Sequence, residues 1–248
     1  DPQLNELVAH AQINNADVQI AVARLGQAQA LARQAGAALY PTLNMTASGT
    51  RASSGTSVSR SGVGFQANTA QIGLVTSYEI DVWGRVRRNI ESATAVATAS
   101  QYEQDSVRLT LSALVTNTYL RLRALDAQID VVTNSVKTRE NSLRVAQAKL
   151  DGGLVSPIDV SLARAAKAAS EANLSELTRQ RAIVQNQLGI LTGQLQLTLA
   201  PGDLRGLPIP PIPPAGLPST LLESRPDINR VEQELTAANA RIGVATAN

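Results

Sequence analysis

Residues 85–150 of this chain are a stretch of 66 residues that contains neither proline nor glycine. Apolar residues such as Val86, Ile90, Ala93 and Ala97 recur in it at alternating steps of four and three, which is the pattern of a coiled-coil seam. At 1.5 Å per residue this stretch predicts one helix roughly 99 Å long. The chain is therefore predicted to be mainly α-helical, with long antiparallel coiled-coil helices.

Two shorter helices are predicted to flank the long one. The first covers residues 3–39, where the seam is apolar except at Asn14, and Pro41 ends it. The second covers residues 157–192 and returns antiparallel along the far half of the long helix. Together the two are long enough to cover the whole seam of residues 85–150.

The turn that joins the long helix to its successor has strong local signals. Gly152 and Gly153 can release the chain from a helix end, because glycine adopts the left-handed conformation easily. Ser156 is a suitable N-cap, Pro157 fits the first helical turn, and Asp159 stands where the acid of a capping box belongs. These residues predict a well-capped helical hairpin.

Residues 41–83 have a period of two instead. Alternating runs begin at Leu43 and at Ile72, the second reaching Ile80, and the polar loop 51–64 separates them. The pattern predicts one β-hairpin with strands of about ten residues. A strand of ~9–11 residues can cross a bilayer when tilted. A soluble hairpin packed on a helix fits the same alternation, so periodicity leaves both interpretations open.

Composition excludes several classes of function. There is no cysteine, one histidine (His10) and six aromatic residues, so neither thiolate nor histidine metal sites are expected. The net charge of +2 does not indicate a nucleic-acid partner. Glu79 and Asp81 are paired carboxylates at strand spacing, but polar lining of a barrel explains them better than catalysis does, because no partner histidine accompanies them. No enzyme activity and no cofactor is predicted.

The last part of the chain resembles a restart of the first. Residues 195–218 form a predicted connector, and seven of the eleven prolines lie between Pro201 and Pro218. A shift of 210 residues then aligns Asp17 with Asp227 and Ala28 with Ala238. The sequence is therefore predicted to hold one complete repeat and the start of a second.

Three stretches resemble the outer-membrane factor family of tripartite efflux pumps, the TolC/OprM-like channels, and its NodT-type lipoprotein branch in particular. They are a strand-to-helix junction, a tip turn and the start of a second repeat: Ser77–Arg87, Gly153–Asp159, and Gly216–Ser219 with Arg225–Asp227 and Ala237–Gly243. The resemblance covers nearly all of the chain and about half of a family-length protein.

The resemblance implies a homotrimer in the outer membrane of a Gram-negative bacterium. Each repeat would give two strands to a shared transmembrane β-barrel and helices to a periplasmic α-barrel. The implied function is the outer-membrane channel of an RND-type tripartite system, which passively conducts drugs or other small molecules. The implied partners are a periplasmic adaptor (membrane fusion protein), an inner-membrane pump and outer-membrane lipid. A lipid-anchored cysteine, where the family has one, would lie upstream of Asp1.

The resemblance also implies two sets of site residues. The set expected to dock the adaptor lies at the periplasmic tip and consists of Lys149, Gly152, Gly153, Leu154, Val155, Ser156 and Asp159. Lys149 stands where the family usually has arginine, which keeps the positive charge but loses the planar hydrogen-bonding fork. The set expected at the membrane interface consists of Trp83, Arg85, Arg87 and Arg88.

The predicted organisation follows from these signals. It comprises a first helix (1–40), a transmembrane hairpin (41–83) with an extracellular loop (51–64), a helical hairpin (84–194) with its tip at 151–159, a connector (195–218), and the first helix of a second repeat (219–248), the rest of which lies outside the sequence. Two alternatives remain. A flagellin-like filament protein would share the composition and long helices, and a periplasmic adaptor would share the helical hairpin.

Overall fold

The structure is a computed structural model that describes residues 1–54, 65–206 and 219–247. Most of the described residues are helical, and the rest include a two-stranded antiparallel sheet. In chain order the elements are α1 (Pro2–Asn14), α2 (Ala16–Ala37), β1 (Thr42–Ser54), β2 (Phe65–Ser77), α3 (Arg85–Asp151), α4 (Pro157–Thr192), the 3₁₀ turns η1 (Leu204–Gly206) and η2 (Ser219–Leu222), and α5 (Pro226–Thr246). Within these ranges no helix has an apolar stretch long enough to cross a bilayer.

The chain forms two compact units, each considered separately. The helical unit comprises Asp1–Arg24 and Tyr102–Ile228, and the hairpin unit comprises Leu25–Gln101 and Asn229–Asn248. The predicted long helix and its successor match α3 and α4 to within one residue. The lengths of these two helices follow from local chemistry, since α3 has no helix breaker and α4 has a cap at each end.

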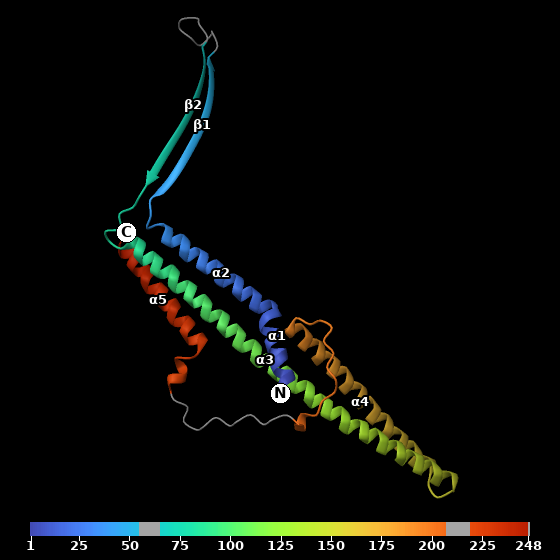
Figure 1. Cartoon of the computed structure of the whole chain (residues 1–248). Coiled ribbons are helices and arrows are strands. Elements are labelled where there is room, and N and C mark those ends of the chain that lie inside the picture. The colour runs from blue at the N-terminus through green and yellow to red at the C-terminus, as the bar shows by residue number, and fades with distance from the viewer. Residues whose placement is uncertain (55–64, 207–218, 248) are drawn as a thin grey trace. The chain divides into compact units, whose positions relative to one another are not determined.

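The core of the helical unit lies where α1, α3 and α4 meet (Figure 1). Its most deeply buried side chains include Tyr119, Leu122 and Leu188. Around them pack apolar residues from α1, the start of α2, α3 and α4: Leu7, Ala11, Val18, Leu111, Val115, Leu125, Leu177 and Val184. This is the seam expected from the three- and four-residue spacing.

The single helix predicted over residues 3–39 is wrong in one respect, because it is interrupted at Asn15. Asn15 has an extended backbone, with φ −69° and ψ 134°, and is only 5% exposed. Its Oδ1 accepts the backbone N–H of Asp17 at 2.8 Å, and its Nδ2 donates to the carbonyl of Leu191 on α4 at 3.0 Å. The side chain therefore caps α2 and ties the break to α4.

The hairpin unit holds β1 and β2, which pair from Thr42 opposite Ser77 to Ser54 opposite Phe65. Each strand has 13 residues, three more than the predicted ten. The second strand was also expected to continue to Ile80, but it ends at Ser77 because the following carboxylates bind the start of α3. The predicted loop 51–64 is wrong at its start, because residues 51–54 belong to β1, and residues 55–64 lie outside the described residues.

Small side chains let α5 pack closely on the first part of α3 in the hairpin unit (Figure 1). Ala237 and Ala240 are each 2% exposed, and the Ser92 hydroxyl donates to the Ala237 carbonyl at 3.0 Å. A Cβ on Gly243 would stand 3.0 Å from Arg88 Cγ. The helix predicted to open a second repeat is thus present, while the repeat itself stays a prediction.

Candidate functional site

The tip of the helical hairpin is built by two complementary caps. The Leu154 N–H donates to the Lys149 carbonyl at 2.8 Å, and the Gly153 N–H donates to the Leu150 carbonyl at 2.9 Å. Gly153 has φ +73°, so the end of α3 is a Schellman motif that needs the left-handed conformation. Gly152 precedes it with an ordinary backbone.

The start of α4 is closed by the predicted capping box. The Ile158 N–H donates to Ser156 Oγ at 3.3 Å, and the Ser156 N–H donates to Asp159 Oδ2 at 2.9 Å. Pro157 occupies the first turn, where its missing N–H costs nothing. Ser156 and Asp159, both predicted as docking residues, therefore hold the turn in shape.

Two surfaces at the tip are open to a partner. A groove of about 570 Å³ runs between α3 and α4 and brings together Lys149, Val155 and Asp159 from the predicted set. Next to it, Leu154 is 78% exposed and Ile158 is 68% exposed. The structure thus brings the predicted tip residues together. Gly152 and Gly153 form the turn itself, and the apolar side chains of Leu154 and Ile158 are exposed.

The strand-to-helix junction is held by paired carboxylates and arginines. Arg85 donates to both oxygens of Glu79, at 2.8 and 2.5 Å. Asp81 accepts the backbone N–H groups of Val86 and Arg87, each at 3.0 Å, and Arg87 Nε at 3.2 Å. The two carboxylates lie at the positive end of the helix dipole, where negative charge is stabilising. Glu79 and Asp81 therefore hold the start of α3 in place, whereas the sequence had suggested that they line the interior of a barrel.

The remaining residues of the predicted membrane interface differ in their surroundings. Trp83 is 83% exposed and directly precedes Gly84, whose φ of +83° turns the chain into α3. Arg88 pairs with Glu91 one turn further along the helix, at 2.6 Å. All three arginines of the set therefore have carboxylate partners, and Trp83 presents its ring to the surroundings.

A third site, in the helical unit, was not predicted. Arg123 and Asp126 on α3 are 4% and 6% exposed, and Arg181 on α4 completes a buried cluster. Asp126 accepts Arg123 Nη1 at 3.0 Å, Arg181 Nε at 2.6 Å and the Gly202 N–H at 3.0 Å. We call Arg123, Asp126 and Arg181 the connector latch, because they bind the segment that follows α4.

The latch is completed by bonds to the connector backbone. Arg123 Nη1 donates to the Ala200 carbonyl at 2.8 Å, and Arg181 Nη2 donates to the Leu199 carbonyl at 2.9 Å. Gly202 lies so close to the guanidinium that an added Cβ would stand 2.6 Å from Arg123 Nη1. Burial opposes the charge on Arg123, but its hydrogen bonds to Tyr119 and Asp126 outweigh burial and raise its pKa.

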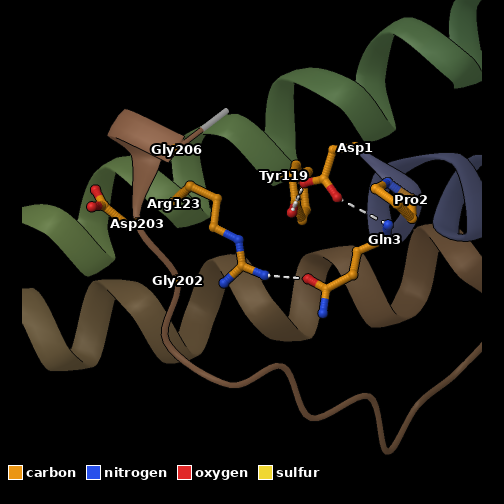
Figure 2. Close-up of a pocket in the computed structure, with 8 residues that line it drawn as sticks. All are labelled: Asp1, Pro2, Gln3, Tyr119, Arg123, Gly202, Asp203 and Gly206. Atoms are coloured by element: carbon orange, nitrogen blue, oxygen red, sulfur yellow. Dashed lines mark hydrogen bonds between the residues drawn. The ribbon is translucent and has the colours of Figure 1, made fainter. Parts of the chain in front are cut away.

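A pocket of about 390 Å³ lies beside the latch (Figure 2). Figure 2 shows Arg123 and Gln3 pointing toward one another, and Arg123 Nη2 donates to Gln3 Oε1 at 2.7 Å. The Tyr119 hydroxyl donates to Asp1, and its ring centroid lies 4.9 Å from Arg123 Cζ. The polar side chains that line this pocket form hydrogen bonds with one another and with the connector backbone. The pocket therefore marks the place where α1, α3 and the connector are held together.

Nothing in these sites resembles a catalytic or metal centre. Within residues 1–54, 65–206 and 219–247 there is no group of three or more His, Asp or Glu side chains that could hold a metal ion. The ionic groups at the junction and the latch form structural pairs. What the arrangement provides is exposed surfaces and capped, ion-paired helices, the features of a hairpin-and-coil scaffold.

Comparison with known proteins identifies the family. The family model for outer membrane efflux proteins matches residues 7–194. The toluene efflux pump outer membrane protein TtgC of Pseudomonas putida is 34% identical over 250 residues, which is 100% of this chain and 51% of that protein. The pyoverdine export outer membrane protein OpmQ of Pseudomonas aeruginosa is 35% identical over 258 residues, covering 99% of this chain and 53% of its own length.

Solved structures agree with this match. The outer-membrane channel OprN superimposes with a TM-score of 0.84 at 30% identity, over 100% of this chain and 56% of that one. The open state of the MtrE outer membrane channel of Neisseria gonorrhoeae gives 0.84 at 28% identity, over 99% and 55%. The chain belongs to the outer membrane efflux protein family, whose solved relatives OprN and MtrE are outer-membrane channels. It spans about half the length of the curated relatives it matches.

These matches confirm the predicted family, the fold class and the outer-membrane location. They do not support the filament and adaptor alternatives, because the relatives are channels. The roles of the tip and interface residues are not tested by them and stay predictions.

Proposed function

We propose that this chain is the first repeat and the opening of the second in an outer-membrane channel that conducts small molecules passively from the periplasm to the exterior. The observation that carries the proposal is the hairpin of β1 and β2. Leu43, Met45, Ile72 and Leu74 share one face of it and are all at least 67% exposed. An isolated two-stranded hairpin is only marginally stable in water. Contact with lipid would bury its apolar face, and neighbouring strands would pair with the free edges of β1 and β2.

A homotrimer is the assembly that supplies those strands. Each copy of the complete gene product would contribute the hairpin of each repeat, and the closed barrel leaves no strand edge unpaired. Exposed apolar side chains of α3 that lie outside the core, such as Leu109 and Val131, would likewise face helices of other copies. Substrates for export are expected to be small molecules, as the names of TtgC and OpmQ indicate for those proteins.

The tip is proposed to dock a periplasmic adaptor, which connects the channel to an inner-membrane pump that supplies the energy. Leu154 and Ile158 would provide apolar contacts, and Lys149 a charge at the rim of the groove. The caps of α3 and α4 support this role, because they hold these side chains on a rigid turn.

The first test is the mass of the complete gene product extracted in detergent. A detergent-dependent trimer supports the channel, whereas a monomer or a filament that is soluble without detergent contradicts it. The tip is tested separately with Leu154→Ser and its matched control Leu195→Ser, which alters an exposed leucine just beyond the end of α4 and away from the turn. Adaptor cross-linking should fall for Leu154→Ser alone, and an equal effect of both variants would argue against docking at the tip.

A further inference from the structure

The apolar face of the hairpin has a sharp upper limit. The register places Met45 opposite Leu74 and Ala47 opposite Ile72 on this face, followed by Gly49 opposite Ala70. The next pair on the same face is Arg51 opposite Asn68. The face thus changes from apolar to polar within one cross-strand step.

Arg51 is unusual within the sheet. It is the one charged residue in β1 and β2, both of which the structure describes along their length. Its side chain is exposed, and it makes no hydrogen bond or ion pair with any described residue. The arginines of the junction, in contrast, all have carboxylate partners. No described residue pairs with Arg51, which leaves its charge available to a group outside the chain.

The distance along the strand places Arg51 at a membrane boundary. From Thr42 to Arg51 there are nine steps, which at ~3.4 Å per residue and a tilt of ~40° cover about 23 Å along the barrel axis. The apolar band of outer-membrane barrels is about 25 Å tall. Trp83 and Tyr40, 83% and 71% exposed, lie near the helix end of the hairpin, where an aromatic girdle belongs. The opposite end of the band then falls at Arg51.

We propose that Arg51 binds a phosphate of a lipid headgroup in the outer leaflet. This inference rests on the proposed membrane placement of the hairpin. A guanidinium matches phosphate oxygens with two parallel hydrogen bonds, and the aliphatic part of the side chain can lie along the apolar face below it. Asn68, directly across the sheet, has a side-chain amide that can donate to the same headgroup.

The test is a binding titration on the complete gene product in detergent, followed by native mass spectrometry. The probes are lipid A with its phosphates, the same lipid after removal of the phosphates, and inorganic phosphate. The matched variant is the double exchange Thr50→Arg with Arg51→Thr, which keeps the composition and moves the charge to the other face of the same strand. Arg33→Thr, on α2, is the control for loss of an exposed arginine elsewhere.

The exchange should weaken binding of the phosphorylated lipid about fivefold per site, the effect of one basic residue near an anionic surface, and leave the dephosphorylated lipid unchanged. Arg33→Thr should change neither. Arg51→Gln, a single exposed substitution, gives the same test if the double variant does not assemble. Equal lipid binding by wild type and variants overturns the proposal, and so does displacement of the lipid by inorganic phosphate at equal concentration, which would assign a free-anion site. The same spectra report the oligomer, so a trimer with unchanged lipid binding contradicts the Arg51 inference alone, whereas absence of a trimer contradicts the channel.

Discussion

The connector latch makes a specific prediction about stability, because one carboxylate accepts hydrogen bonds from the buried Arg123, the largely buried Arg181 and a backbone amide. In Asp126→Asn the shape of the side chain is kept but its charge is lost. The retained oxygen still accepts hydrogen bonds, while the new amide group faces either Arg181 Nε or the two donors Arg123 Nη1 and Gly202 N–H, depending on which oxygen is replaced. The Arg123 guanidinium then stays buried, and the Arg181 guanidinium largely buried, without a counter-charge.

Loss of one partner from a buried ion pair costs about 3–5 kcal/mol, and the retained oxygen favours the lower end. We therefore expect Asp126→Asn to weaken attachment of the connector by about 3 kcal/mol, which raises the population of the detached state roughly 100-fold. The connector is where this effect concentrates, because Leu199, Ala200 and Gly202 are bound directly by the latch.

Tryptic cleavage after Arg205 measures that detachment. The Arg205 side chain is 83% exposed, but the bound connector on its N-terminal side keeps the backbone from entering a protease. Cleavage under native conditions follows the population of the open form when closing is fast. The peptide that ends at Arg205 should therefore appear roughly 100-fold faster in Asp126→Asn, by mass spectrometry of the complete gene product.

Glu176→Gln is the matched control, because it removes a carboxylate from an exposed pair on α4. The Glu176 and Arg179 side chains are 47% and 60% exposed, and such pairs contribute little to stability. Cleavage after Arg205 should stay within about twofold of wild type in this variant. If Asp126→Asn also stays within about threefold while its helix content is unchanged, the latch does not hold the connector and the reasoning is refuted.

Three further predictions concern local features. Asn15→Ala should lower the free energy of unfolding by about 1–2 kcal/mol, because it removes the cap of α2 and a hydrogen bond to α4. Denaturant titration measures this change, and a decrease of less than about 0.5 kcal/mol would contradict the proposed role of Asn15. Gly153→Ala should destabilise the tip by about 1–2 kcal/mol through its positive φ, whereas Gly152→Ala should have a much smaller effect, and hydrogen exchange of the turn amides compares them. The pKa of Glu176 is lowered to about 2 by hydrogen bonds from Arg179 and Gln180. The small contribution of this pair to stability is therefore present at neutral pH and disappears as the pH falls through about 2, where Glu176 becomes protonated. In Arg179→Ala a carboxyl-detected NMR titration should show this pKa higher than in wild type, and an unchanged midpoint would contradict the assignment.

Local signals were sufficient for the helical hairpin and its tip. The start of α4 follows from Ser156, Pro157 and Asp159, and its capping box closes between residues three apart. The end of α3 follows from the two glycines, and the backbone hydrogen bonds that close the turn reach back at most five residues. Every interaction that fixes the geometry of the tip therefore lies within a window that sequence patterns describe.

The strand boundary shows where periodicity stops being informative. Alternation continues past Ser77 through Tyr78 and Ile80, so the pattern alone extends the strand. The chain leaves the sheet because Asp81 binds the first N–H groups of α3 five and six residues ahead. A carboxylate shortly before a helix start is a recognisable signal in a sequence. Here it predicts the end of the strand better than the alternation of apolar and polar residues does.

The break at Asn15 and the connector latch depend on contacts that no local window contains. Asn15 reaches the Leu191 carbonyl, 176 residues away, and Asp126 reaches Arg181 and Gly202, 55 and 76 residues away. Buried polar groups need partners with good geometry, and for these residues the partner comes from another helix or from the connector. The usable signal in sequence is a charged or amide residue where the seam should be apolar, as at Asn14–Asn15 and beside Leu122 and Leu125. Apolar contacts along a uniform seam tolerate a shift of one helix against another, but a buried ion pair or hydrogen bond does not. Polar residues at such positions therefore hold the helices in one register.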